Sequence, residues 1–148
     1  KGQRYPPSLL QLAGSSDVWL FRLPTIREVA PLYAVLSDPS VTKAGVAVRD
    51  DLRKLRERGP VEEVGFVELQ ALSSRAGIQE NGLRGMAARV LGGRIDKGAQ
   101  LANWAAPRLT RAQIDYAATD AWICRELYLR LAAPPVTTTP TGTTPVGT

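Results

Sequence analysis

The chain has 148 residues, 44% of them hydrophobic, which is enough for one domain with one ordinary core. Its formal net charge of +5 makes a polyanion the more natural partner, although many soluble domains carry a similar charge. It contains no histidine and one cysteine, so neither a Ser-His-Asp triad nor a Cys/His zinc site can be built. Chemistry must therefore rely on carboxylates, Tyr, Lys, Arg or hydroxyl groups, and carboxylate sites prefer hard cations such as Mg²⁺ or Mn²⁺.

Features that report on location are few. No apolar run is long enough to span a membrane, and the start of the chain lacks the pattern of a signal peptide. Cys124 has no disulfide partner within the chain and fits a reducing compartment. We therefore expect a soluble intracellular protein, cytoplasmic and without a membrane partner. The chain opens on Lys1 rather than Met, and we expect residues to be missing upstream.

The first predicted elements are a hairpin and a helix. Two apolar runs, at residues 9–13 and 18–23, flank the turn sequence Gly-Ser-Ser-Asp and predict a β-hairpin. Thr25 and Glu28 have the spacing of a capping box, and apolar residues follow at helical spacing. We expect this helix to begin at Thr25 and to end at residues 37–39.

The middle of the chain alternates between strand and helix patterns. A β-rich run at residues 43–48 leads into a charged amphipathic helix that ends at Gly59-Pro60, with Asp50 and Asp51 at the junction. The run at residues 64–69 fits either a strand or the start of a helix.

Two helices close the predicted domain. The pattern predicts them at residues 83–91 and 110–131, the second with a capping box between Thr110 and Gln113. Residues 134–148 are rich in Thr, Pro and Gly and have almost nothing to bury, so we expect them to be disordered. Strands followed by helices that alternate with strands predict a layered α/β or α+β domain.

Three side chains are candidates for chemistry. Tyr116 and Asp120 are four residues apart on the last predicted helix, so both project from one face and can serve one site. Taken alone, such a pair is more often structural. Asp51 fits both a site carboxylate and a first-turn acid favoured by the helix dipole, and Asp50 is better explained as an N-cap.

The surrounding residues favour the functional interpretation. Trp104, Leu109-Thr110, Gln113 and the run from Tyr116 to Ala121 together resemble the third exonuclease motif of the DEDDy-type 3'-5' exonucleases, the family of ribonuclease D and the Werner-type exonucleases. Residues 43–55, where a Lys-x-Gly strand leads to an Asp at the head of a helix, resemble the second motif.

Two further segments extend the resemblance, which runs from Lys1 to about Leu131. The helix at residues 83–92 and the connector from Lys97 to Trp104 are both similar to the family pattern. The family's first motif, Asp-x-Glu on a central strand, is not found in this chain, and the resemblance places it just upstream of Lys1. The chain would then lack one strand and two metal ligands.

The resemblance implies a ribonuclease-H-like α/β fold over residues 1–133, with a mixed sheet covered by helices on both faces and its first strand apparently missing. It implies hydrolysis of phosphodiester bonds at the 3' ends of DNA or RNA with two divalent cations, Mg²⁺ or Mn²⁺. Asp51 and Asp120 would be metal ligands, and Tyr116 would orient the nucleophile.

Other roles remain open. Arg94 and Lys97 are candidates for substrate contacts, although Lys97 is equally well explained as a solvated lysine, and Trp104 is better explained as a packing anchor. Without the Asp-x-Glu motif, the chain alone should bind metal weakly and turn over little or nothing. The alternative function is a catalytically degenerate module that binds nucleic acid or a protein.

Overall fold

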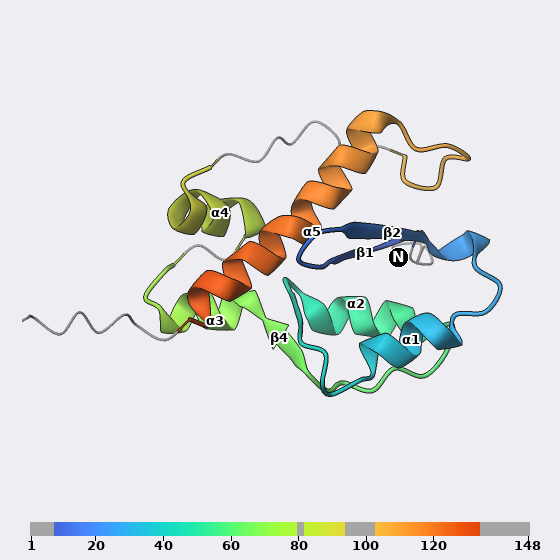
Figure 1. Ribbon diagram of the computed structural model, residues 1–148, viewed down its shortest axis with the longest axis horizontal. Coiled ribbons are helices and arrows are strands. Elements are labelled where there is room, and N and C mark those ends of the chain that lie inside the picture. Colours follow the sequence, from blue (N-terminus) through green and yellow to red (C-terminus); the bar gives the residue numbers. More distant parts are fainter. Residues whose placement is uncertain (1–7, 80–81, 94–102, 134–148) are drawn as a thin grey trace, which may run out of the picture.

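The computed structural model describes residues 8–79, 82–93 and 103–133 (Figure 1). The expected substrate contacts Arg94 and Lys97 and the Thr/Pro/Gly-rich segment 134–148 lie outside the described residues. In chain order the elements are strands β1 (Leu9–Ala13) and β2 (Val18–Arg22), 3-10 helix η1 (Leu23–Thr25), helix α1 (Ala30–Leu36), strand β3 (Lys43–Gly45), helix α2 (Val48–Leu55), strand β4 (Phe66–Glu68), and helices α3 (Leu69–Arg75), α4 (Leu83–Leu91) and α5 (Arg111–Leu131).

The strands form two small sheets. The predicted hairpin is confirmed: β1 pairs antiparallel with β2, from Leu9 opposite Arg22 to Ala13 opposite Val18. Strand β3 pairs in parallel with β4, from Lys43 opposite Phe66 to Gly45 opposite Glu68. Within the described residues the two pairs are not joined by a ladder, so the expected mixed sheet is present as one antiparallel and one parallel pair.

Helix α5 packs across both sheets, contacting β1, β2 and β3, and it also contacts α3 and α4 (Figure 1). Successive side chains of β1 point to opposite faces of the hairpin, so each face can pack against a different layer. Leu10 and Leu12 pack against a core built with α1 and α2, whereas Leu9 and Gln11 share a pocket with residues of α5. Helices therefore cover both faces of the hairpin, as expected.

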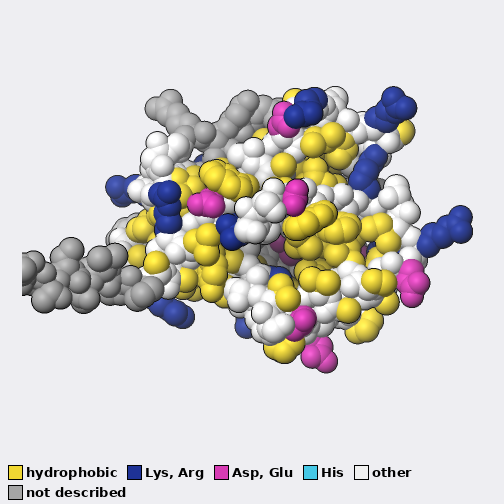
Figure 2. Space-filling model, in the orientation of Figure 1, with side chains coloured by type: hydrophobic (Ala, Val, Ile, Leu, Met, Phe, Trp, Pro, Cys, Tyr) yellow, Lys and Arg dark blue, Asp and Glu magenta, His cyan; other side chains and the backbone are white. Residues whose placement is uncertain are grey.

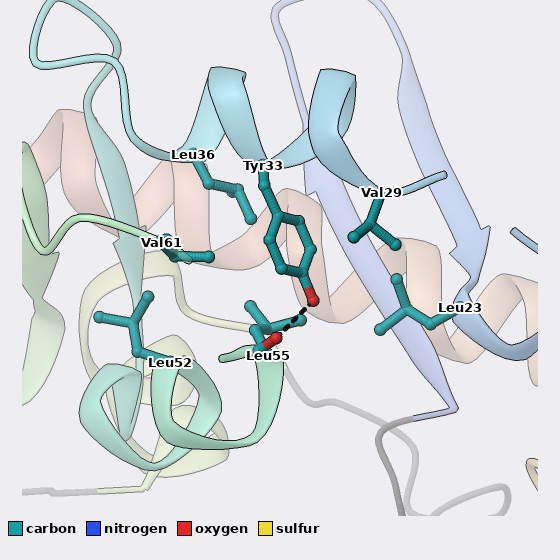
Figure 3. Packing of buried hydrophobic residues seen from close by; sticks show 7 residues of the cluster. All are labelled: Leu23, Val29, Tyr33, Leu36, Leu52, Leu55 and Val61. Atoms are coloured by element: carbon teal, nitrogen blue, oxygen red, sulfur yellow. Dashed lines mark hydrogen bonds between the residues drawn. The ribbon is translucent and has the colours of Figure 1, made fainter. Parts of the chain in front are cut away.

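A first core cluster holds α1 against α2 (Figure 3). Its buried members are Leu23, Val29, Tyr33, Leu36, Leu52, Leu55 and Val61. Tyr33 is only 3% exposed, and its hydroxyl donates to the carbonyl oxygen of Leu55 at 2.6 Å. Burial raises the pKa of the Tyr33 phenol, so it remains a neutral donor. This bond fixes the end of α2, the helix that carries Asp51.

A second core cluster joins α3, α4 and α5. Its buried members are Leu69, Met86, Ala87, Ile123 and Leu127. They anchor the C-terminal half of α5, and the same helix also contacts both strands of the hairpin. Among the described residues, no helix is long and apolar enough to cross a membrane.

Helix α1 begins at Ala30, so the prediction of a capped helix from Thr25 is wrong. Pro31 explains the difference: it lacks an N–H, and in a helix begun at Thr25 its ring would clash in the interior, whereas in the first turn it is tolerated. The Thr25 hydroxyl instead donates to the carbonyl oxygen of Arg22 at 2.7 Å, within the turn that η1 forms.

The strand predicted at residues 43–48 ends at Gly45, because α2 begins at Val48. The N-cap is Ala47, so the assignment of Asp50 as N-cap is wrong, and both Asp50 and Asp51 lie in the first turn. The ambiguous run at residues 64–69 divides into β4 and the start of α3. The capping box between Thr110 and Gln113 is confirmed.

Candidate active site

One pocket of about 320 Å³ lies between α2, α5 and the hairpin. It brings Asp51 from α2 together with Tyr116 and Asp120 from α5, although Asp51 is far from the other two in the sequence. The residues around it are Ser8, Leu9, Gln11, Asp51, Lys54, Trp104, Tyr116, Ala117 and Asp120. The carboxylates expected to act together therefore line one concave surface.

The α5 side of the pocket is fixed by the start of that helix. Thr110 Oγ1 accepts from the Gln113 amide at 3.1 Å, and Gln113 Oε1 accepts from the Thr110 amide at 2.8 Å. Gln113 Nε2 also donates to the carbonyl oxygen of Asn103 at 3.0 Å, which ties down the segment that carries Trp104. The Trp104 and Tyr116 rings lie 6.1 Å apart at 41°, a tilted aromatic pair. Trp104 therefore packs on Tyr116 and also lines the pocket.

The α2 side is fixed by a carboxylate from β4. Glu68 accepts from the amide of Ala47 through Oε1 and from that of Val48 through Oε2, both at 2.9 Å. A negative charge at a helix N-terminus is favourable, and these two bonds satisfy amides that the helix leaves without partners. They also hold Ala47 in the left-handed conformation (φ 56°), which is uncommon for a residue other than Gly. Glu68 thus sets where α2 begins, one turn before Asp51.

Both pocket carboxylates have raised pKa values. Asp51 is an exposed residue overall, but the atoms around its carboxyl group remove part of its water, and this raises its pKa; Lys54 opposes the rise. Burial likewise raises the pKa of Asp120, opposed by Arg84. Charging these groups therefore costs free energy that a bound cation would relieve.

The carboxylates fit part of a cation site. Divalent cations such as Mg²⁺ take oxygen ligands, which Asp51 and Asp120 can supply. In the part of the chain that the structure describes, no group of three or more His, Cys, Asp or Glu is placed to hold a metal ion. Cys124 follows Asp120 by one turn, but burial and neighbouring carboxylates raise the pKa of its thiol to about 12. The thiol is therefore protonated at neutral pH when no metal is bound.

Three residues of the site were not identified from the sequence as functional candidates. Lys54 lines the pocket, and its position three residues after Asp51 on one helix is a signal that could have found it. Arg84 donates from Nη2 to Tyr116 Oη at 2.7 Å. Glu68 lies in the run that was ambiguous in the sequence, which gave no hint of its role.

Comparison with known proteins identifies the family. Residues 8–133 match the sequence profile of a domain family described as 3'-5' exonuclease. The chain belongs to this family. Exonuclease 3'-5' domain-containing protein 2 of Drosophila melanogaster is 36% identical over 134 residues, 88% of this chain and 23% of that protein. Ribonuclease D of Acidiphilium cryptum is 33% identical over 133 residues, 87% of this chain and 34% of that protein. The chain thus spans about a quarter to a third of these relatives.

Solved structures support the same assignment. The crystal structure of Escherichia coli RNase D, an exoribonuclease involved in structured RNA processing, is 29% identical with a TM-score of 0.80, and the match covers 89% of this chain and 36% of that one. Brucella melitensis NrnC bound to pGG is 25% identical with a TM-score of 0.71, and the match covers 83% and 61% of the two chains. These similarities confirm the expected ribonuclease-H-like α/β fold and the resemblance to ribonuclease D.

Proposed function

We propose that this exonuclease domain removes nucleotides from the 3' ends of nucleic acids with the help of two divalent cations, using Asp51, Tyr116 and Asp120. The observation that carries the proposal is that these three side chains line one pocket. Membership of the 3'-5' exonuclease family supports the reaction. Because the chain spans only part of its relatives, the activity of the whole protein is inferred from the site and the family.

The cations would supply charge stabilisation to the attacking and leaving oxygens of the phosphodiester. Asp51 on α2 and Asp120 on α5 would hold them, and burial, which raises the pKa of both carboxyl groups, favours a compensating positive charge beside them. The Tyr116 hydroxyl would orient the attacking water, and the Lys54 ammonium would contact a phosphate of the substrate.

Two carboxylates neutralise two dications poorly, and no third ligand joins them within the described residues. We therefore propose that the 148-residue chain alone turns over little or nothing, and that activity needs an Asp-x-Glu, which a chain extended upstream of Lys1 would have to supply. A degenerate binding module is the second candidate, favoured by this shortage of ligands. The residues encoded before Lys1 discriminate between the two candidates.

The surface fits a nucleic acid partner. Lys and Arg side chains project around the rim of the face drawn in Figure 2, whereas hydrophobic side chains occupy much of its middle. With the net charge of +5, this spread of cations favours a polyanion, either DNA or RNA. The single free Cys124 supports action in the cytoplasm.

A substitution panel on the extended chain tests the proposal. Tyr116→Phe should lower exonuclease activity in Mn²⁺ by about 10²–10⁴-fold, the range for positioning and acid-base groups, and Asp120→Asn and Asp51→Asn should each lower it further. Asp115→Asn is the matched control, because Asp115 is exposed on the same helix and pairs with Arg111 away from the pocket wall. If the folded Asp120 and Tyr116 variants kept the activity of the control, the binding-module function would replace the enzyme.

A further inference from the structure

Arg84 is not among the residues that line the pocket, but it contacts one of them, Tyr116. It belongs to α4, and its Nη2 reaches across to α5 to donate to Tyr116 Oη at 2.7 Å. Its Nε is buried and has no hydrogen-bond partner among the described residues. A partly buried guanidinium with an unused donor is costly, since a buried donor without a partner loses the hydrogen bond that it would make to water. A side chain that only filled space between α4 and α5 would be better served by an apolar residue.

We propose that Arg84 is a positioning residue that makes the Tyr116 hydroxyl a hydrogen-bond donor directed at the pocket. A guanidinium can only donate, so the phenolic oxygen must accept from it. The hydroxyl hydrogen must then point elsewhere, and Tyr116 faces the pocket together with Asp120. This inference rests on the proposed function, in which Tyr116 orients the attacking water through its hydroxyl.

Two neighbouring observations agree with this role. The positive charge of Arg84 also opposes the rise in the pKa of Asp120, so one cation acts on both site residues of α5. The packing of α4 on α5 does not depend on it, because Met86 and Ala87 already meet Ile123 and Leu127 in the second core cluster. Arg84 can therefore be replaced without dismantling the contact between the two helices.

A double-mutant cycle on the extended chain tests the coupling. Arg84→Ala should lower kcat about tenfold to a hundredfold with little change in KM, the loss expected for one hydrogen bond to a charged group. In a Tyr116→Phe background the same change should have almost no further effect. Arg84→Lys should restore part of the rate, and Arg89→Ala, an exposed change on the same helix, should leave it unchanged. Losses that multiply in the double variant would overturn the inference.

A second readout needs no catalysis and uses the 148-residue chain itself. With ¹³Cζ-labelled tyrosine, the Tyr116 resonance is identified by its loss in Tyr116→Phe, and it should shift in Arg84→Ala more than in Arg84→Lys. An unchanged resonance in the folded Arg84→Ala variant would overturn the inference even if the enzyme were active. Absence of nuclease activity in the extended wild-type chain, with the shift present, would instead refute the proposed function and leave the Arg84–Tyr116 contact standing.

Discussion

Replacing Glu68 by Ala removes the carboxylate that caps α2 and leaves two amide groups, those of Ala47 and Val48, without their partner. Two hydrogen bonds to a charged group could be worth about 1.5–3 kcal/mol each. Ala47 is exposed, so water can replace the lost hydrogen bond to its amide, and Val48 is only partly buried. The loss should therefore lie near the range for a helix cap, about 1–2 kcal/mol.

The assay is thermal or urea unfolding of the 148-residue chain. For a domain of this size, 1–2 kcal/mol lowers Tm by roughly 2–8 °C. Glu68→Gln keeps one acceptor oxygen and should lose less. Glu63→Ala is the matched control, because its pairing with Arg49 is an exposed contact at 3.5 Å and should be worth under about 1 kcal/mol.

The same variant should lower exonuclease activity in the extended chain beyond what its stability explains, because α2 carries Asp51 one turn after the cap. Activity is measured well below the Tm of the variant, where the folded fraction is complete. Equal stability of Glu68→Ala and Glu63→Ala would refute the capping argument. A destabilised variant with full activity would show that the cap does not position Asp51.

Three further predictions concern the pocket and the core. Burial raises the folded-state pKa of Asp120 above 3.8. The stability that the protonated carboxyl group contributes is therefore complete below pH 3.8 and is lost as the pH rises through the folded-state pKa. Asp120→Asn should have a higher urea midpoint than wild type at neutral pH, and this difference in midpoint should close below about pH 3.8. Lys54→Ala should weaken binding of a fluorescent oligonucleotide and reduce the salt slope, the slope of log binding constant against log salt concentration, by about 1. Arg53 pairs with Asp50, so Arg53→Ala should leave this slope near that of wild type. Leu127→Ala empties a fully buried position and should cost about 2–5 kcal/mol in urea unfolding. A pH-independent difference in urea midpoint would contradict the first prediction, and equal salt slopes for Lys54→Ala and Arg53→Ala would contradict the second. A loss of unfolding free energy under about 1 kcal/mol in Leu127→Ala would contradict the third.

Elements with local signals could be predicted from the sequence. The hairpin follows from two apolar runs around a tight turn, and the start of α5 follows from the capping box between Thr110 and Gln113. The start of α1 was missed because Pro31 outweighed a capping-box spacing at Thr25. The start of α2 was missed because its cap comes from Glu68, a residue distant in the chain whose role no local pattern reveals.

The candidate site divides in the same way. Tyr116 and Asp120 share one helix face, so their proximity follows from spacing, whereas the approach of Asp51 depends on the packing of α2 and α5 around the hairpin. Motif resemblance suggested that approach, and composition and periodicity alone could not. The bond from Arg84 to Tyr116 joins two helices, and a pattern within either helix does not predict it.

The most direct measurement is the polarity of degradation by the extended chain. A single-stranded oligonucleotide labelled at its 5' end and the same oligonucleotide labelled at its 3' end are incubated with Mn²⁺, beside the Asp120→Asn and Asp115→Asn variants. We expect a shortening ladder from the 5' label, immediate release of a labelled mononucleotide from the 3' label, and loss of both in Asp120→Asn alone. Cleavage within the strand, or a ladder that persists in Asp120→Asn, would contradict 3'-5' exonuclease action at this pocket.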